Sequence, residues 1–170
     1  MRMLFNILAV MAVAIIIAAS TFVLFGRERT WTAIAGPADL GALDLTTVER
    51  TQKPHDALLC SQGLCDAVTV DQTLSTYDVS PAELIAALDA AATTVTHHVQ
   101  RVDDGTDATK ARYVARSNLM RFPDTIWLQA VTMDDGRTGL IAYARAQLGY
   151  SDLGVNKARL EGWIAQASLD

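Results

Sequence analysis

An uninterrupted apolar run near the start of the chain restricts its fold more than any other feature. Leu4 to Phe25 are 22 residues without a formal charge. Coiled as an α-helix, this run reaches about 33 Å, enough to cross a hydrocarbon core of about 30 Å. Secretory signal peptides have shorter apolar stretches of about 7–15 residues, and here the run continues past the small residues Ala18, Ala19 and Ser20. We therefore expect an uncleaved transmembrane anchor, with a cleaved signal peptide as the alternative.

The rest of the chain is acidic. The 170 residues include 14 Lys and Arg and 19 Asp and Glu, for a net charge of −5. Arg2, Arg27, Glu28 and Arg29 lie before Thr30, so the part from Thr30 onward has 11 basic and 18 acidic residues and a net charge of −7. Nucleic-acid binding depends on neutralising phosphates with Lys and Arg. We therefore expect no nucleic-acid partner, and no electrostatic hold of this part on anionic lipid head groups.

A helix start stands out in the middle of the chain. In Ser80-Pro-Ala-Glu83 the serine is a helix N-cap, the proline fills the first helical position and the glutamate completes a capping box. Apolar residues at helical spacing continue to about Ala92, where we expect the helix to end. The β-branched run from Thr93 to Val102 predicts a strand after it, and Ala111 to Leu119 predicts the next strand.

A hairpin and a closing helix follow. The apolar runs Thr125 to Met133 and Gly139 to Gln147 are separated by Asp134-Asp135-Gly136-Arg137, and an Asp-Gly pair in that position indicates a hairpin turn. The closing helix is predicted by an apolar face of Leu160, Trp163, Ile164 and Ala167, with Lys157, Arg159 and Glu161 expected to face solvent. The predicted fold class is α+β, an N-terminal transmembrane helix followed by a two-layer sandwich of three or four antiparallel strands with helices on one face.

The closing stretch resembles a known family. Gly149, Ser151, Asp152, Gly154, Val155, Asn156, Arg159 and Glu161 are similar to the closing signature of the domain of unknown function 1499 family. The blocks Tyr113 to Ser117 and Leu119 to Asp124 resemble the middle of the same family, and the resemblance runs from about Pro54 to the C-terminus. It implies a bacterial exported or membrane-tethered protein, from a family without a settled activity.

These patterns predict three parts, namely an anchor over residues 1–26, a juxtamembrane segment over 27–54 and an α+β domain over 55–170. Arg2 precedes the apolar run and Arg27 and Arg29 follow it, so the positive-inside rule leaves the orientation nearly balanced. The pair Cys60 and Cys65, together with the resemblance, favours export. We therefore expect a single-pass protein of the cell inner membrane with its domain in the periplasm, as part of the bacterial cell envelope.

The two cysteines are candidates for a disulfide. Cys60 and Cys65 are five positions apart, which suits a small bonded loop in an oxidising compartment. Two free thiols and a metal site are the alternatives, but only His55, His97 and His98 can supplement the thiols, and their spacing is not that of a zinc site. We expect no metal and no cofactor.

Polar residues near the predicted strand ends form one candidate ligand-binding site. Its members are Arg116, Ser117, Arg121, Tyr143, Arg145, Ser151, Asp152 and Asn156. Guanidinium groups on strands, close to the free N–H groups of a helix start, bind carboxylate or phosphate. The alternative is structural, with Asp152 paired to an arginine and Asn156 capping the helix, so that the strand is locked to the helix.

The sequence contains no nucleophile elbow, phosphate loop or dinucleotide fingerprint, so we assign no catalytic residues. The predicted function is a non-enzymatic domain that binds a small anionic or amphipathic ligand, or another envelope protein. The alternative is an envelope enzyme acting on an anionic substrate through Arg116, Arg145, Tyr143 and Asp152.

Overall fold

The computed structural model describes residues 2–167 and divides the chain into two compact units. The first extends to Gly36 and the second begins at Pro37. The juxtamembrane segment predicted over residues 27–54 is therefore divided between them, because residues 37–54 pack onto the sheet of the second unit. Each unit is described by itself.

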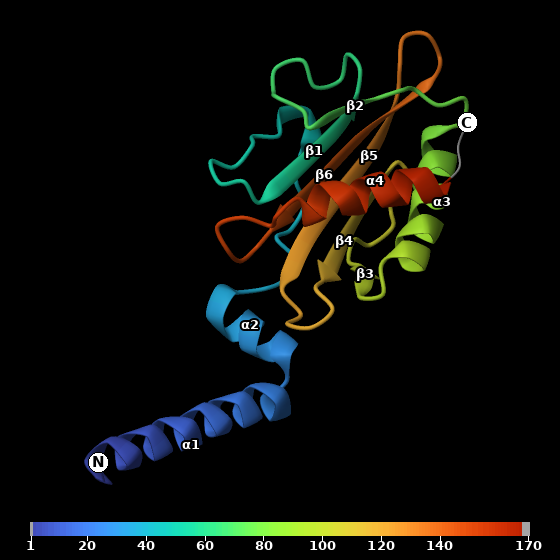
Figure 1. The fold of residues 1–170 in the computed structure, drawn as a ribbon. Helices are drawn as coiled ribbons and strands as arrows, with labels where there is room; N and C mark the ends of the chain where they lie inside the picture. Colours follow the sequence, from blue (N-terminus) through green and yellow to red (C-terminus); the bar gives the residue numbers. More distant parts are fainter. Residues whose placement is uncertain (1, 168–170) are drawn as a thin grey trace. The chain divides into compact units, whose positions relative to one another are not determined.

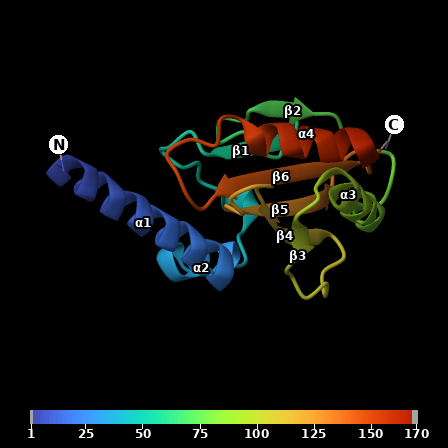
Figure 2. The ribbon, with the colours of Figure 1, turned by 60° about the horizontal axis from the view of Figure 1, so that its bottom comes forward.

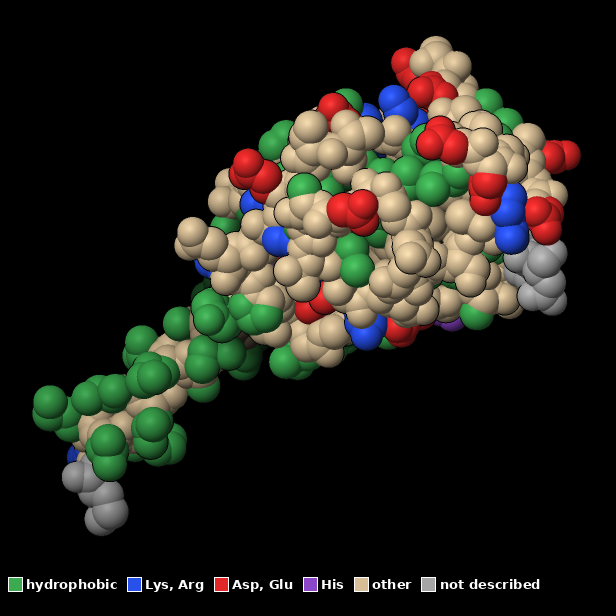
Figure 3. Space-filling model, turned by 90° about the horizontal axis from the view of Figure 1, so that it is seen from above, with side chains coloured by type: hydrophobic (Ala, Val, Ile, Leu, Met, Phe, Trp, Pro, Cys, Tyr) green, Lys and Arg blue, Asp and Glu red, His purple; other side chains and the backbone are tan. Residues whose placement is uncertain are grey.

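The first unit consists of two helices, α1 (Arg2–Phe25) and α2 (Arg27–Ala35), separated at Gly26, whose φ of 97° suits glycine (Figure 1). Helix α1 has 24 residues and contains an 18-residue stretch with a mean hydropathy of 2.8, so it is long and apolar enough to cross a membrane, a test that a signal sequence also passes. None of its residues is buried, and hydrophobic side chains cover its visible surface in Figure 3.

The second unit is built on an open six-stranded sheet. Its strands are β1 (Asp56–Ser61), β2 (Gln72–Leu74), β3 (Val99–Arg101), β4 (Lys110–Arg116), β5 (Pro123–Thr132) and β6 (Thr138–Ala146), in the spatial order β2-β1-β6-β5-β4-β3. Neighbouring strands are antiparallel except β1 and β2, which are parallel. The predicted α+β class is confirmed, although the sheet has six strands rather than three or four. The strands at its two edges have only three residues each.

The predicted hairpin is confirmed as β5 and β6, paired in register from Asp124 with Ala146 to Thr132 with Thr138. Its turn contains Gly136 with a φ of 82°, a left-handed conformation that glycine adopts without steric cost.

Helix α3 (Pro81–Val95) begins as predicted. The Ser80 hydroxyl accepts a hydrogen bond from the Glu83 backbone N–H, and the Glu83 carboxylate accepts one from the Ser80 N–H, which completes the capping box. The strand predicted from Thr93 was wrong at its start, because the helix continues to Val95 and β3 covers only Val99–Arg101. Packing of α3 against the last helix overrides the β-branched sequence there, since Val95 lies against Gly162.

Helices α3 and α4 (Val155–Ala167) cover the same face of the sheet, here called the helix face (Figure 2). Helix α4 lies over β1 and β6, and α3 packs mainly on β5 and β4. The largest buried residues of this face are Leu59, Leu84, Ile85, Leu88, Tyr113, Ile126, Leu140, Leu160 and Trp163. They form one continuous apolar core.

The opposite face, here called the loop face, is covered by irregular chain from residues 37–54 and 62–71. A single 3-10 turn, η1 (Leu45–Thr47), is the only helical turn in these two segments. A smaller core lies beneath them, formed by Leu45, Val48, Leu58, Cys60, Trp127, Ile141 and Tyr143. Cys60 and Cys65 are joined by a disulfide, which fixes the start of the second covering segment to β1.

Candidate functional site

The structure separates the eight predicted site residues into two groups. Tyr143 and Arg145 lie on β6 and Arg116 on β4, all on the loop face. Strand β5 runs between β4 and β6, so Arg116 and Arg145 are on strands about 10 Å apart. The other five residues lie in the β4–β5 loop, the β6–α4 loop and the first turn of α4.

In the β6–α4 loop, the predicted polar residues hold the backbone. The Asp152 carboxylate accepts hydrogen bonds from the N–H groups of Gly154 at 3.1 Å and Asn156 at 2.9 Å. The Ser151 hydroxyl accepts one from the Leu153 N–H at 3.1 Å. Asp152 therefore caps α4, in place of Asn156 as the structural alternative had it.

Asn156 instead joins a buried ion pair that sequence reasoning missed. Arg159 donates to the Asp124 carboxylate at 2.9 Å and also to the Asn156 side-chain oxygen. Burial raises the pKa of the Asp124 carboxyl above its ordinary value, against the opposing effect of Arg159. The expectation that Arg159 faces solvent was wrong, because its side chain is only 9% exposed and links α4 to β5. The lock between helix and strand exists, but Arg159 and Asp124 form it.

A mostly apolar pocket of about 260 Å³ lies beside this pair, between the β4–β5 loop and the β6–α4 loop. Ser117, Ser151 and Asp152 line it, together with Phe122, Leu148, Leu153, Val155 and both members of the ion pair. Arg121 lies in the β4–β5 loop, in a left-handed conformation with a φ of 61°.

On the loop face, Asp56 is the centre of a polar cluster. Its buried carboxylate accepts hydrogen bonds from the Arg50 guanidinium at 3.0 Å, the Thr51 N–H at 2.9 Å and the Tyr143 hydroxyl at 2.9 Å. Burial alone would raise the pKa of Asp56, but these three donors hold it below its ordinary value. Arg50 also forms an ion pair with Asp71 at 3.0 Å.

Tyr143 is held neutral in this cluster. Burial and the hydrogen bond to the Asp56 carboxylate both raise the pKa of Tyr143 above its ordinary value. Its ring stacks on Trp127, with ring centroids 5.6 Å apart. A phenol with a raised pKa is a poor general base near neutral pH, and Asp152 lines the other pocket. The four residues of the enzyme alternative therefore do not meet in one cleft.

Arg145 is an exposed cation of this face. It stands directly opposite Asp56 across β1 and β6, where opposite charges ordinarily pair. The Asp56 carboxylate is already occupied by its three donors, and the Arg145 side chain forms no hydrogen bond or ion pair with any of residues 2–167. It lines a pocket of about 470 Å³ between the sheet and residues 40–51, with Arg50, Trp127 and Tyr143 in the wall.

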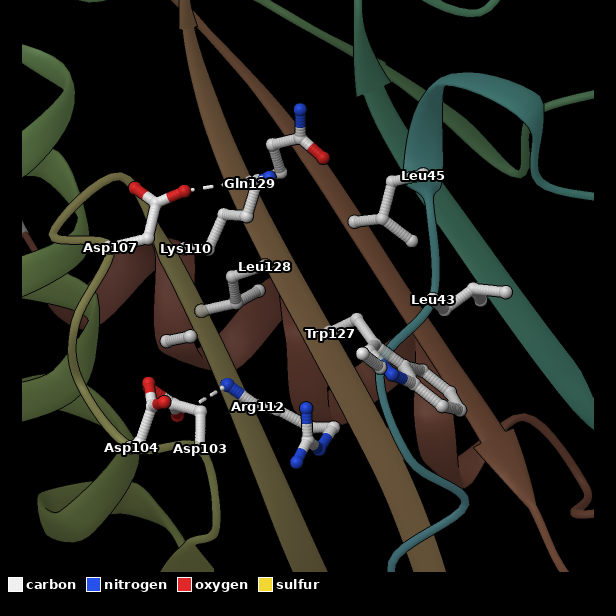
Figure 4. Close-up of a pocket in the computed structure, with 12 residues that line it drawn as sticks. Leu43, Leu45, Asp103, Asp104, Asp107, Lys110, Arg112, Trp127, Leu128 and Gln129 are labelled. Atoms are coloured by element: carbon white, nitrogen blue, oxygen red, sulfur yellow. Dashed lines mark hydrogen bonds and ion pairs between the residues drawn. The ribbon is translucent and has the colours of Figure 1, made fainter.

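A second, smaller pocket on this face holds about 150 Å³ (Figure 4). It extends from Trp127 and Leu43 to the acidic β3–β4 loop, where Asp107 pairs with Lys110. Asp103 in this loop accepts hydrogen bonds from the Arg101 side chain and from the backbone N–H groups of Arg112 and Gly105. Burial raises the pKa of Asp103, but these hydrogen bonds outweigh that effect and lower the pKa to about 2. Within the part of the chain that the structure describes, no cluster of three or more His, Cys, Asp or Glu is arranged to hold a metal.

Comparison with known proteins identifies a family. The profile of the family described as "Protein of unknown function (DUF1499)" matches residues 48–166. No curated protein and no solved structure matches the chain. The matched range extends from before β1 to Gln166 in α4. It includes the strand residues that line the two loop-face pockets and the Asp124–Arg159 ion pair. The chain belongs to this family.

Proposed function

We propose that this member of the DUF1499 family is a single-pass membrane-anchored binding protein, with α1 in the bacterial inner membrane and the α+β domain in the periplasm. The domain binds a small anionic ligand in the loop-face pocket beside Arg145 and catalyses no reaction.

Two features support the proposed location. Helix α1 has the length and apolar composition of a membrane span. The domain contains a disulfide between Cys60 and Cys65, and disulfides persist in oxidising compartments such as the periplasm.

The unpaired state of Arg145 carries the binding proposal. Five other arginines of the domain form ion pairs with carboxylates, namely Arg50, Arg101, Arg112, Arg137 and Arg159. Arg145 has a carboxylate as its cross-strand neighbour and still forms no such pair, because Arg50, Thr51 and Tyr143 occupy Asp56. A guanidinium left without a partner at a pocket mouth is available for a carboxylate or phosphate from outside the chain.

The pocket has the size and wall chemistry of a small-molecule site. Its volume of about 470 Å³ falls within the range of about 300–1,000 Å³ that is usual for ligand pockets. The stacked pair Trp127 and Tyr143 supplies a rigid aromatic wall. The Arg50 Nε is a buried donor without a hydrogen-bond partner, and it is a second candidate to bond a ligand oxygen.

The test is native mass spectrometry of the full-length protein extracted gently from its own membrane. We expect a discrete added mass of a small molecule that disappears in Arg145→Ala. Arg137→Ala is the matched control, because Arg137 is also an exposed arginine but pairs with Asp78 away from the pocket. The free energy of unfolding of Arg145→Ala should change by less than about 0.5 kcal/mol, as for other exposed side chains.

An added mass that persists in Arg145→Ala would place the ligand elsewhere. A wild-type chain that carries no small molecule, or only another polypeptide, would contradict the ligand proposal and favour a protein partner of the envelope.

A further inference from the structure

Two loops at one end of the sheet expose large apolar side chains. The β4–β5 loop and the β6–α4 loop, with the first residue of α4, contain Leu119, Met120, Phe122, Tyr150, Leu153 and Val155, here called the apolar loop cluster. Leu153 is 91% exposed, Leu119 76% and Tyr150 72%. Apolar residues scattered singly on a surface are ordinary, but several gathered on adjacent loops mark a contact surface for a protein or a membrane.

A backbone hydrogen bond holds the two loops next to each other where they leave the sheet. The Gln147 N–H donates to the Pro123 carbonyl at 3.1 Å, which joins the end of β6 to the start of β5. The pocket of about 260 Å³ lies between the loops and is lined by Phe122 from one and by Leu148 and Leu153 from the other. The cluster is therefore one surface.

This end of the sheet is also where the domain is attached to α1 and α2 through the chain. The Gln147 side-chain amide donates to the carbonyl of Pro37, the first residue of the domain, at 2.6 Å. The hydroxyl of Thr125, at the start of β5, donates to the carbonyl of Ala38 at 2.9 Å. This end of the sheet is here called the entry end. Only residues 26–36 separate it from the end of α1 at Phe25, a distance of at most roughly 40 Å even when fully extended.

The opposite end of the sheet, the far end, has contrasting loops. The β3–β4 loop, the β5–β6 turn and the connection before α3 carry Asp78, Asp103, Asp104, Asp107, Asp134 and Asp135 against the single cation Arg137. The two loops that carry the apolar loop cluster contain one cation, Arg121, and one carboxylate, Asp152. Figure 3 looks onto the far end and shows its Asp and Glu side chains at the surface.

We infer that the entry end rests on the lipid surface of the membrane that holds α1, with the side chains of the apolar loop cluster in the bilayer interface. The inference rests on the anchoring in the proposed function. An anionic head-group layer repels the carboxylates of the far end and does not oppose the two loops of the apolar loop cluster, whose single cation and single carboxylate balance. Moving leucine, valine and phenylalanine side chains out of water lowers the free energy. Tyrosine favours the interface, where its ring is in an apolar layer and its hydroxyl in a polar one.

The test places a fluorescent label on each end of the full-length protein. The native cysteines are bonded to each other, so a new single cysteine takes the label selectively. Leu153→Cys and Tyr150→Cys report the entry end, and Asp135→Cys is the matched control on an exposed turn of the far end. Each variant is labelled with an environment-sensitive dye and reconstituted in vesicles of phosphatidylethanolamine and phosphatidylglycerol. Some vesicles contain lipids with a nitroxide quencher high on the acyl chain.

We expect the labels at residues 153 and 150 to be quenched several-fold more strongly by the lipid nitroxide than the label at residue 135, with emission shifted to the blue. Equal, weak lipid quenching at all three positions in protein that stays with the vesicles on alkaline carbonate washing would overturn this inference and leave the anchoring intact. Release of the chain by the wash would overturn the anchoring and the inference together. A label at residue 153 that is protected from water only in native membranes, and not in the lipid vesicles, would identify a protein as the occupant and reject lipid.

Discussion

The two faces of the sheet are formed by the same strands, but different chain covers them. The helix face buries alternate residues of β1, β4, β5 and β6 beneath two regular helices, and its core is continuous from Leu59 to Trp163. The loop face buries the intervening residues beneath chain with a single 3-10 turn, a disulfide and a network of charges around Asp56.

The two faces differ in how completely their side chains are packed and paired. Side chains of the helix face pack closely against one another. Their polar atoms form hydrogen bonds inside the domain, as the indole N–H of Trp163 does with the Thr96 hydroxyl. On the loop face, the irregular covering chain does not fill all the space above the sheet. A pocket of about 470 Å³ is left there, and the side chain of Arg145 at this pocket is unpaired. We expect the helix face to contribute most of the stability, and the ligand site proposed above lies on the loop face.

The largest expected effect comes from removing an aromatic ring of the helix face. In Trp163→Ala the ring in edge contact with Tyr113 at 5.2 Å is lost, together with the hydrogen bond to Thr96 at 2.8 Å. A cavity in a closely packed core should lower the free energy of unfolding by about 4 kcal/mol. Chemical denaturation of the full chain measures it.

The matched change on the loop face is Trp127→Ala. Trp127 already borders two pockets, where water and the covering chain can adjust to its loss, so we expect a smaller decrease in stability than for Trp163→Ala. An equal or larger decrease would show that the two faces do not differ as described.

The next largest effect is expected at the junction of α4 and the sheet. Arg159→Met keeps an apolar side chain but leaves the Asp124 carboxylate buried without its cation. Breaking one side of a buried ion pair should cost about 3 kcal/mol at pH 7. Lys157→Met is the control, because Lys157 is a half-exposed lysine of the same helix in a weak pair with Glu161, and it should cost about 0.5 kcal/mol or less.

The pH dependence of Arg159→Met has a definite sign. Because burial raises the folded-state pKa of Asp124 above the ordinary value of 3.8, the folded protein binds this proton more tightly than the unfolded chain does, and more so without Arg159. The loss of stability should therefore shrink as the pH falls from 7 toward 4 and Asp124 becomes protonated. Denaturation curves at several pH values check this, and a constant loss would mean that Asp124 is not the group left unpaired.

The smallest of the three effects concerns the covalent bond of the loop face. Removing the disulfide in Cys60→Ala with Cys65→Ala should lower the free energy of unfolding by about 2 kcal/mol, the loop-closure value for a ring of this size. Hydrogen exchange should become faster mainly in residues 62–71, with α3 and α4 nearly unchanged. An equal increase in the two helices would show that the faces are not independent in stability.

Sequence patterns predicted the elements whose signals are local. The capping box at Ser80, the Asp-Gly turn at Gly136 and the apolar spacing of Leu160 and Trp163 each lie within a few residues. Each of these signals lies in the element that it predicted, although α3 ends three residues later than expected. Strand β1 was missed because it is buried on both faces, so it lacks the alternation that marks a half-buried strand. Strand β2 has only three residues, too few for a pattern.

Site residues were harder to predict, because their roles depend on partners far along the chain. Arg159 resembled a solvent-facing helix residue, and its partner Asp124 lies 35 positions away. Tyr143 and Arg145 were correctly placed on one strand, but the fact that Asp56 is bonded by Tyr143 and not by Arg145 depends on a contact 87 positions long. A buried aspartate opposite an arginine is visible only once the register of β1 and β6 is known.

The three-residue strands β2 and β3 at the edges of the sheet have a consequence for crowding. Proteins held in a membrane diffuse in two dimensions with their domains at similar heights, so copies of one chain collide often and in similar orientations. A long free edge would let two copies add their sheets together, as in the early steps of amyloid growth. Here each edge offers backbone groups over only three residues, so the sheet gives a second copy little to pair with, a property that suits the membrane attachment proposed above.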